Sequence, residues 1–249
     1  MSKRLALQAL AIAAGVAAAI VFLGGPVAGN PFLNPAWELW NTIGRELDGE
    51  FLGRHMLATM KTGILGYLLG SASGIVLGIV ISLTNFLSQA LYPVLIWARA
   101  TPSAAIVPVA IAMLGFHSST IVFLVAATTM LNVAVTTGLA LAQTNKSYLD
   151  VAQVYRFNPL QRLLVVRFGS NLKVVFIGLH AGLQSAIGVT LLAEALSSDT
   201  GLGAYILFSL RTFRLDNLWF ALVVIGLMGL TFNAIFHFLE SRVLGFSHG

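Results

Sequence analysis

Residues 144–173 read TNKSYLDVAQVYRFNPLQRLLVVRFGSNLK, the longest polar interval of an otherwise apolar chain. Strongly apolar segments flank this interval on both sides. Asp150 is its one acidic residue, and its basic residues are Lys146, Arg156, Arg162, Arg167 and Lys173. A cationic loop between apolar segments is typical of the cytoplasmic side of a membrane protein. We therefore predict that 144–173 is a cytoplasmic loop and that the flanking segments span a membrane.

Apolar residues within this loop recur at helical spacing. Leu149, Ala152 and Tyr155 form one such series, and Asn158-Pro159 interrupts it. The series then resumes at Leu160, Leu163 and Leu164. This pattern predicts two short helices outside the bilayer that present apolar faces to another molecule. The alternative interpretation is a positively charged loop that only sets the membrane topology.

The composition of the whole chain supports a membrane protein. Of its 249 residues, 57% are hydrophobic and 9% are charged, whereas soluble domains carry about 25% charged residues. The net charge is +5, but the sequence has no arginine-rich arm and no basic-aromatic stripe, which argues against a nucleic-acid partner. The sequence contains no cysteine, which excludes disulfides and cysteine-ligated metals. Its five histidines are scattered without the spacing of metal ligands.

We predict an all-α polytopic membrane protein with about six transmembrane helices. The expected spans are 5–23, 57–83, 90–114, 120–141, 174–196 and 218–239. A cleaved signal peptide is the alternative for the first of them. Between the first two spans, an amphipathic helix on the membrane surface is indicated by residues three and four apart: Trp37, Trp40, Ile43 and Leu47. The expected organisation is a single transmembrane domain, 1–249, in which 1–56 precedes a core of 57–241.

Two of the spans have unusual patterns. In 57–83 a glycine stands at every fourth position, at Gly66, Gly70, Gly74 and Gly78. Such a stripe lets another helix backbone approach closely, so it predicts a packing face. The segment 90–114 contains Pro93, Pro102 and Pro108 together with Arg99. Proline bends or breaks a helix, and broken backbone at membrane depth is buried in protein or lines a cavity.

Several local patterns follow one another along the chain: Asn34-Pro35, Gly49 and His55; Arg99-Ala100-Thr101-Pro102, Ile106-Val107-Pro108 and Gly115-Phe116; and Ala193-Glu194 with Gly201-Leu202-Gly203. In this ordered set the chain resembles the permease subunit of a bacterial ABC importer, in the branch that includes nitrate, taurine and aliphatic sulfonate transporters. The resemblance implies a type I ABC importer permease (MetI-like) fold in the bacterial inner membrane. Eight basic residues on the side of 144–173 against five on the other predict cytoplasmic N- and C-termini.

The resemblance also assigns a role to the loop 144–173. In this family the cytoplasmic loop forms a coupling helix that docks in a groove of the ATP-binding subunit. Asp150-Val151-Ala152 matches the start of the family motif, while Arg156 stands in its glycine slot and Gly169 in its proline slot. The residues expected to couple to the ATPase are Asp150, Ala152, Tyr155, Arg156, Phe157, Leu160 and Arg162.

The sequence has no phosphate-cradling Gly-x-x-x-x-Gly-Lys motif, so we expect no enzyme activity and no cofactor in this chain. ATP and Mg²⁺ would bind in a partner ATPase. The partners that the resemblance implies are a pair of cytoplasmic ATP-binding subunits, a second permease chain as a homodimer or a heterodimer, and a periplasmic or lipid-anchored substrate-binding protein. The alternative function is an ion-coupled secondary transporter, for which Glu194 would be the coupling acid.

Candidate residues of a solute pathway or gate are Arg99, Thr101, Ser103, Gln184, Ser185 and Glu194. Arg99 could attract an anion, or it could cap carbonyl groups at the cytoplasmic interface. For Glu194 the resemblance favours a structural gate over a solvated helix end. For the polar residues, the alternative to a pathway is hydrogen bonding between helices. Gly201 to Gly203 would bring an outer loop close to a binding protein or would form a turn with unusual backbone angles.

Overall fold

The computed structural model describes residues 42, 44 and 50–245. The predicted span 5–23 and the predicted amphipathic helix around Trp37 and Trp40 lie outside the described residues. Between 50 and 245 the chain is helical and forms no strand. The helices are α3 (Glu50–Ser82), α4 (Asn85–Ala100), α5 (Ser103–Leu114), α6 (Ser118–Ala142), α7 (Lys146–Val154), α8 (Pro159–Gln161), the π-helix η1 (Arg162–Phe168), α9 (Leu172–Ser197), α10 (Leu202–Arg211) and α11 (Leu215–Gly245). The all-α prediction is confirmed.

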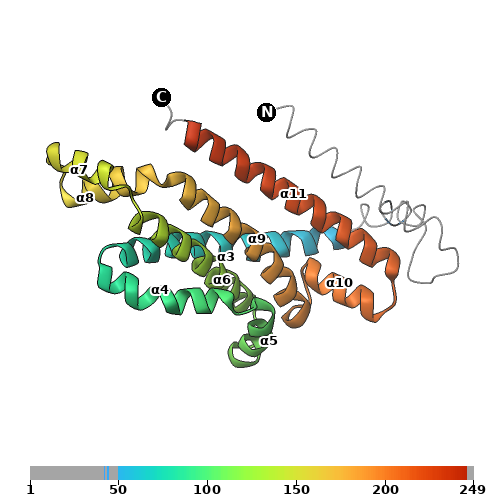
Figure 1. Cartoon of the computed structure of the whole chain (residues 1–249). Helices are drawn as coiled ribbons and strands as arrows, with labels where there is room; N and C mark the ends of the chain where they lie inside the picture. The colour runs from blue at the N-terminus through green and yellow to red at the C-terminus, as the bar shows by residue number, and fades with distance from the viewer. Residues whose placement is uncertain (1–41, 43, 45–49, 246–249) are drawn as a thin grey trace, which may run out of the picture.

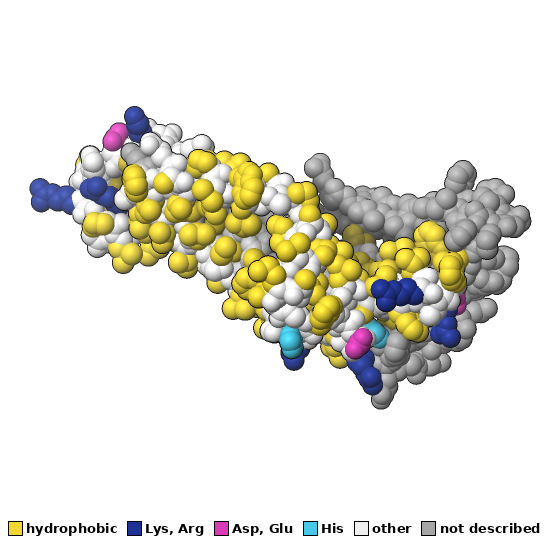
Figure 2. All heavy atoms as spheres, turned by 90° about the horizontal axis from the view of Figure 1, so that it is seen from below, with side chains coloured by type: hydrophobic (Ala, Val, Ile, Leu, Met, Phe, Trp, Pro, Cys, Tyr) yellow, Lys and Arg dark blue, Asp and Glu magenta, His cyan; other side chains and the backbone are white. Residues whose placement is uncertain are grey.

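In residues 50–245 four helices are long and apolar enough to cross a membrane, namely α3, α6, α9 and α11. The bent pair of α4 and α5 makes a fifth when it is counted as one broken span. These elements correspond to the five spans predicted after residue 57. Helices α7 and α8 lie at one end of the molecule and α10 lies at the other (Figure 1). Hydrophobic side chains cover the middle, and basic side chains lie toward both ends of the molecule (Figure 2).

The glycine stripe of α3 is a packing face, as predicted. A Cβ atom added at any of its four glycines would lie 2.6–2.7 Å from the Cβ of a residue on α6. The α6 residues are themselves four apart, so each glycine faces one of them: Val125, Thr129, Val133 and Thr137. Distances this short rule out any side chain, because real Cβ atoms do not approach so closely. Glycine therefore allows the two backbones to meet along four successive turns.

The predicted break of the third span occurs at Pro102, where α4 ends and α5 begins. The two helices meet at an angle of 92°. Pro93 and Pro108 lie inside their helices, so of the three prolines only Pro102 stands at a break between helices. Thr101 ends α4, with its backbone N–H bonded to the carbonyl of Trp97 at 3.2 Å. Because α4 has already ended at Thr101, the missing N–H of Pro102 removes no hydrogen bond from inside a helix. This explains why the bend lies there.

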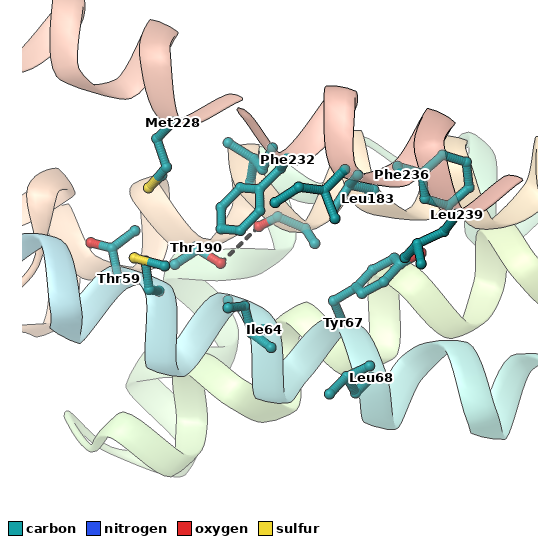
Figure 3. Close-up of a pocket in the computed structure, with 15 residues that line it drawn as sticks. Thr59, Ile64, Tyr67, Leu68, Leu183, Thr190, Met228, Phe232, Phe236 and Leu239 are labelled. Atoms are coloured by element: carbon teal, nitrogen blue, oxygen red, sulfur yellow. Dashed lines mark hydrogen bonds between the residues drawn. The ribbon is translucent and has the colours of Figure 1, made fainter. Parts of the chain in front are cut away.

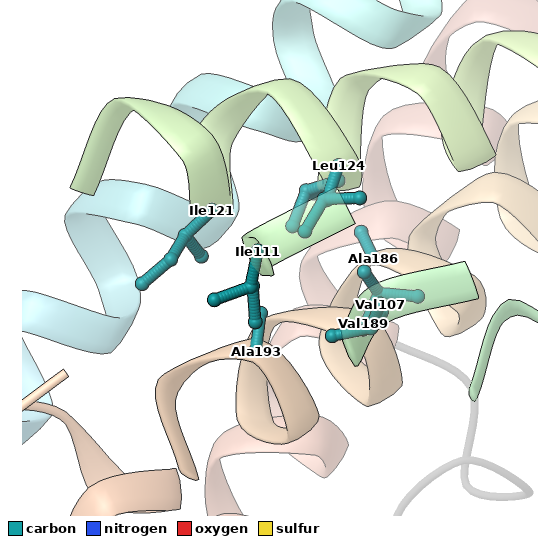
Figure 4. Packing of buried hydrophobic residues seen from close by; sticks show 8 residues of the cluster. Val107, Ile111, Ile121, Leu124, Ala186, Val189 and Ala193 are labelled. Atoms are coloured by element: carbon teal, nitrogen blue, oxygen red, sulfur yellow. The ribbon is translucent and has the colours of Figure 1, made fainter. Parts of the chain in front are cut away.

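The bend turns α5 back onto the bundle. Val107 and Ile111 of α5 are buried against α6 and α9 (Figure 4). Their partners in this core are Ile121, Leu124, Val125, Ala186, Val189 and Ala193. The core thus lies where the glycine-lined pair of α3 and α6 meets α9.

The connection 197–217, between the predicted spans 174–196 and 218–239, contains the helix α10. Leu202 and Tyr205 of this helix are buried at 0% and 1% exposure. Ten apolar-rich residues are too few to register as a span, so the sequence pattern did not reveal the helix. Helix α10 packs on α9, α11 and α3 and closes that end of the bundle.

Candidate functional site

The loop 144–173 is a folded unit that begins with a capped helix. The side chain of Asn145 accepts a hydrogen bond from the backbone N–H of Ser147 at 3.0 Å, which caps α7. Ala152 of α7 is buried at 1% exposure and faces the following segment of the loop. The prediction of two helical segments separated at Asn158-Pro159 is confirmed.

The second segment starts with a reciprocal cap. The Asn158 side chain accepts from the N–H of Gln161 at 2.8 Å, and the Gln161 side chain accepts from the N–H of Asn158 at 3.0 Å. Pro159 occupies the first helical position, where a missing N–H has no cost. The chain then continues as η1, a π-helix of seven residues, rather than as the α-helix that the leucine spacing indicated. A π-helix bonds each residue to the fifth one along, and such segments occur often at functional sites.

The turn between the two segments carries a strained residue. Arg156 has a φ angle of +53°, in the left-handed region. The N–H of Phe157 bonds to the carbonyl of Ala152 at 2.9 Å, and the N–H of Arg156 bonds to that of Gln153 at 3.0 Å. This pair of bonds is the Schellman motif, in which glycine is preferred at the position that Arg156 holds. The family's glycine slot and the backbone angle thus agree, although the residue here is arginine.

The residues predicted for ATPase coupling divide into two groups. Tyr155 and Leu160 are 72% and 63% exposed, and Asp150 and Arg156 are exposed as well. Three others have internal contacts: Ala152 is buried, Phe157 is half-buried, and Arg162 donates from Nε to the Phe157 carbonyl at 3.1 Å. The first group forms a surface, and the second group holds that surface in place.

At the opposite end a cluster that we name the Glu194 clasp joins three elements. It consists of His55, Thr59 and Thr62 of α3, Glu194 of α9, and the turn formed by Gly201, Leu202 and Gly203. Glu194 is 1% exposed. Its carboxylate accepts from the hydroxyl of Thr59 at 2.7 Å, from the hydroxyl of Thr62 at 3.2 Å and from the N–H of Gly203 at 3.2 Å. These three donors satisfy the buried carboxyl group, which makes its burial tolerable.

The turn itself is bonded to α3. The N–H of Leu202 donates to the Thr59 hydroxyl at 2.8 Å. The His55 Nδ1 atom lies 3.0 Å from the nitrogen and 2.9 Å from the carbonyl oxygen of Gly201. Gly201 has a φ angle of +113°, and a Cβ there would overlap the Glu194 carboxyl group. The geometry thus gives Gly201 the second of its two expected roles, a turn with unusual backbone angles.

The clasp brings together patterns that are far apart in the sequence. His55, Ala193-Glu194 and Gly201-Leu202-Gly203 are separate patterns in the family resemblance. The structure places them in one hydrogen-bonded cluster. Thr59 and Thr62 were not predicted. Thr59 follows His55 by four residues, and Thr62 follows Thr59 by three. This helical spacing puts the three side chains on one face of α3, and it is the pattern from which the sequence could have indicated them.

The other pathway candidates are spread over two places. Arg99, Thr101 and Ser103 lie at the bend between α4 and α5, where Arg99 is exposed and the Thr101 hydroxyl bonds to the Trp97 carbonyl at 3.2 Å. Gln184 is exposed on α9, and its neighbour Ser185 accepts from the side-chain nitrogen of Asn132 on α6 at 2.9 Å. Among the described residues no hydrogen bond links the bend to Gln184 or Ser185.

A groove of about 350 Å³ separates α11 from α3, with α9 as its floor. Figure 3 shows Met228, Phe232 and Phe236 of α11 on one side and Ile64 and Tyr67 of α3 on the other. The lining is almost wholly apolar. Such a lining offers a polar solute few hydrogen bonds, so the groove faces lipid or an apolar neighbour rather than forming a solute site.

His180, the histidine within α9, has a partner in the bundle. Its Nε2 atom lies 2.7 Å from the side-chain oxygen of Asn233 on α11, and its ring stacks on Phe236 with centroids 5.1 Å apart. In residues 50–245 no three histidine or acidic side chains come together in a way that could hold a metal ion. These contacts give His180 a role in the packing of α9 against α11.

The chain matches the family described as binding-protein-dependent transport system inner membrane component, over residues 70–244. It is 28% identical over 191 residues to the nitrate import permease protein NrtB of Leptolyngbya laminosa, covering 75% of this chain and 67% of that protein. It is 26% identical over 193 residues to NrtB of Synechocystis sp., covering 78% and 70%. It is also 26% identical over 199 residues to a Bacillus subtilis protein named as an aliphatic sulfonates transport permease, SsuC, covering 80% and 71%. The chain therefore belongs to the binding-protein-dependent transport system inner membrane component family, as an ABC importer permease of the nitrate and aliphatic sulfonate branch.

Proposed function

We propose that this permease is driven by a separate pair of ATPase subunits and that the loop 144–173 is the surface on which they act. The observation that carries this proposal is the exposure of large apolar side chains on the loop. Val154, Tyr155 and Leu160 are 80%, 72% and 63% exposed. Apolar side chains outside the membrane-spanning helices, held on a capped scaffold, are what a protein partner would cover. Aromatic residues such as Tyr155 contribute strongly to such interfaces.

The connections of the loop support a transmitting role. The π-helix η1 leads into α9 after a short turn, so a displacement of the loop is applied to a membrane-spanning helix. Arg167 of η1 donates from Nη1 to the carbonyl of Ser82, the last residue of α3, at 3.0 Å. Hydrolysis of Mg-ATP by the partner would shift the loop, and α3 and α9 would move with it. Two states of such a bundle are the basis of alternating access.

For the transported solute we propose a small anion similar to nitrate, a sulfonate or taurine. The relatives are named for nitrate and aliphatic sulfonates. In this chain Arg99 is exposed at the 92° bend between α4 and α5, next to Thr101 and Ser103. Broken backbone with a cation beside it is a feature of membrane segments that line a cavity. The pathway would be completed by a second permease chain, identical or different, and supplied by a substrate-binding protein.

The ion-coupled alternative finds less support. A coupling acid exchanges protons or ions with a pathway during transport. The Glu194 carboxylate is 1% exposed and accepts from Thr59, Thr62 and Gly203. These contacts make Glu194 a brace between helices.

The coupling proposal is tested by co-purifying the tagged chain with its ATPase from membranes. Tyr155→Asp is expected to release the ATPase and to abolish ATP-dependent uptake, because a carboxylate cannot be desolvated in an apolar groove. Phe213→Asp is the control, since Phe213 is an aromatic residue that is 75% exposed, compared with 72% for Tyr155, but lies beyond α10 at the opposite end. Retention of the ATPase by Tyr155→Asp would refute the assignment of the loop.

The solute proposal is tested by uptake of labelled nitrate and taurine into vesicles that contain the complete transporter. Arg99→Gln is expected to lower the uptake of an anion by about tenfold, while ATPase retention stays unchanged. Equal uptake by Arg99→Gln and the unaltered transporter would remove Arg99 from the pathway.

A further inference from the structure

A second cavity, of about 370 Å³, opens where the cytoplasmic loop meets the end of α3. Leu83 and Leu163 form part of its apolar wall. Its polar side consists of Gln153 of α7 and of Arg162 and Arg167 of η1. Neither the coupling surface nor the Glu194 clasp uses this cavity as a binding site.

The two arginines have donors left over. Arg162 bonds through Nε to the Phe157 carbonyl at 3.1 Å, and Arg167 bonds through Nη1 to the Ser82 carbonyl at 3.0 Å. A guanidinium group has five N–H donors in a fixed fork. Both residues are half-buried, and no acidic residue lines the cavity. Asp150, the nearest acid along α7, is exposed and is not part of the lining.

The π-helix explains why both arginines reach the same cavity. Arg162 and Arg167 are five residues apart. In an α-helix a separation of five residues turns the side chains by roughly 140° away from each other. In a π-helix the hydrogen bonds run between residues five apart, so these positions come closer to one face. The unusual helix thus concentrates positive charge that an α-helix would have spread.

The position of the cavity relative to the membrane-spanning helices restricts its ligand. Leu83 lies in the turn between the end of α3 and the start of α4, and α9 begins shortly after η1. The cavity is therefore at the depth where these spans leave the apolar part of the bilayer. Beside it Leu83 and Phe86 are 54% and 78% exposed. A ligand at this place would meet positive charge on one side and an apolar surface on the other.

We propose that this cavity binds an anionic phospholipid of the surrounding bilayer. Arg162 and Arg167 donate to the phosphate, and the acyl chains lie on the exposed apolar side chains near the turn of α3 and α4. Paired guanidinium groups match the oxygen atoms of a phosphate. Basic pockets between membrane helices on the cytoplasmic side are suited to anionic headgroups. The lipid would supply the negative charge that the cavity lacks and would fix η1 against α3.

The test uses the full-length chain in detergent and native mass spectrometry. The probes are dioleoylphosphatidylglycerol, which is anionic, and dioleoylphosphatidylcholine, which has the same acyl chains and no net charge. The unaltered chain is expected to bind the anionic lipid at least tenfold more tightly. Arg162→Gln is expected to reduce that preference by about tenfold, because a charge-assisted hydrogen bond is lost. Arg156→Gln is the control: it removes the same charge from the same loop at an exposed position outside the cavity.

Three outcomes would overturn the proposal. The first is an unchanged lipid preference in Arg162→Gln. The second is an equal loss in Arg156→Gln, which would show a diffuse charge effect. The third is displacement of the lipid by inorganic phosphate at a comparable concentration, which would make the site one for free phosphate. Arg167→Lys serves as a second variant, since it keeps a cation beside Ser82, and a lipid preference intermediate between those of Arg162→Gln and the unaltered chain is expected.

Discussion

The Glu194 clasp and the loop 144–173 both contain patterns of the permease family, but the side chains of the clasp are buried and those of the loop are exposed. In the clasp the Glu194 carboxylate is 1% exposed and has three donors. In the loop Val154 and Tyr155 are 80% and 72% exposed, although the helix that carries them is capped. The clasp is complete within one chain, whereas the loop is rigid but uncovered. The difference separates residues that hold the bundle together from residues that we propose are covered by a partner.

The largest effect is expected where the clasp loses its acceptor. Glu194→Ala leaves the hydroxyls of Thr59 and Thr62 and the N–H of Gly203 without their shared partner. We expect a loss of about 3 kcal/mol or more in the free energy of unfolding, since the hydrogen bonds that join α9 to α3 are lost, the N–H of Gly203 loses its acceptor, and a cavity replaces the buried side chain. Thermal unfolding in detergent measures it. Gln184→Ala, an exposed change on the same helix, is expected to cost less than about 0.5 kcal/mol. Equal effects of the two changes would show that the clasp is not a structural centre.

A backbone change should come next. Gly201→Ala places a Cβ against the Glu194 carboxyl group at a φ angle of +113°. We expect a loss of about 2 kcal/mol in the free energy of unfolding, because both strain and a steric clash result. Gly188→Ala on α9 has open space around the new atom and is expected to gain about 0.5–1 kcal/mol. The measurement is the change in the free energy of unfolding that each Gly→Ala substitution causes, and the two changes are expected to have opposite signs. Changes of the same sign would contradict the geometry of the turn.

A smaller loss is expected at the link between the clasp and α3. Thr59→Val removes the hydroxyl that donates to Glu194 at 2.7 Å and accepts from Leu202 at 2.8 Å. We expect a cost of about 1–2 kcal/mol in thermal unfolding. Thr231→Val is the control, because that exposed hydroxyl bonds only to a carbonyl of its own helix, at Leu227. A cost at Thr231 equal to that at Thr59 would mean that the clasp adds nothing.

The loop should respond in the other direction. Arg156→Gly relieves a φ angle of +53° and is expected to raise the free energy of unfolding by about 0.5–1 kcal/mol. Arg156→Ala removes the same side chain but keeps the Cβ atom, so it should give no such gain. Amide hydrogen exchange of α7 measures the effect locally. A gain in both variants would assign it to the lost charge instead of the backbone.

The local patterns of the sequence were sufficient for the helices and for one interface. Glycine at every fourth position of a membrane helix indicates a face on which another helix packs closely, and the structure confirms this for α3. The residues of α6 that face these glycines could not be identified from the sequence, because valine and threonine are common in any membrane helix. Similarly, Pro102 and Pro93 look alike in the sequence. What distinguishes them is whether the helix has already ended, as it has at Thr101.

The clasp was less accessible to prediction because three separate segments form it. His55 and Glu194 stood out only through the resemblance, and Thr59 did not stand out at all. Hydroxyl side chains in membrane helices commonly bond to their own backbone, so their pattern gives no hint of a distant acceptor. The π-helix was also unpredictable, since leucines spaced as Leu160, Leu163 and Leu164 suit an α-helix equally well.

Helix α3 has a further consequence for how motion could cross the bilayer. It is one uninterrupted helix of 33 residues. Near its beginning it carries His55 and Thr59, and at its end the Ser82 carbonyl is bonded to Arg167. The distance from Thr59 to Ser82 along the axis is about 35 Å, with no hinge between them. Tilting of the loop end by a few degrees would displace the clasp end by one or two ångströms. A force applied to one end of α3 would therefore be transmitted to its other end by a single rigid helix.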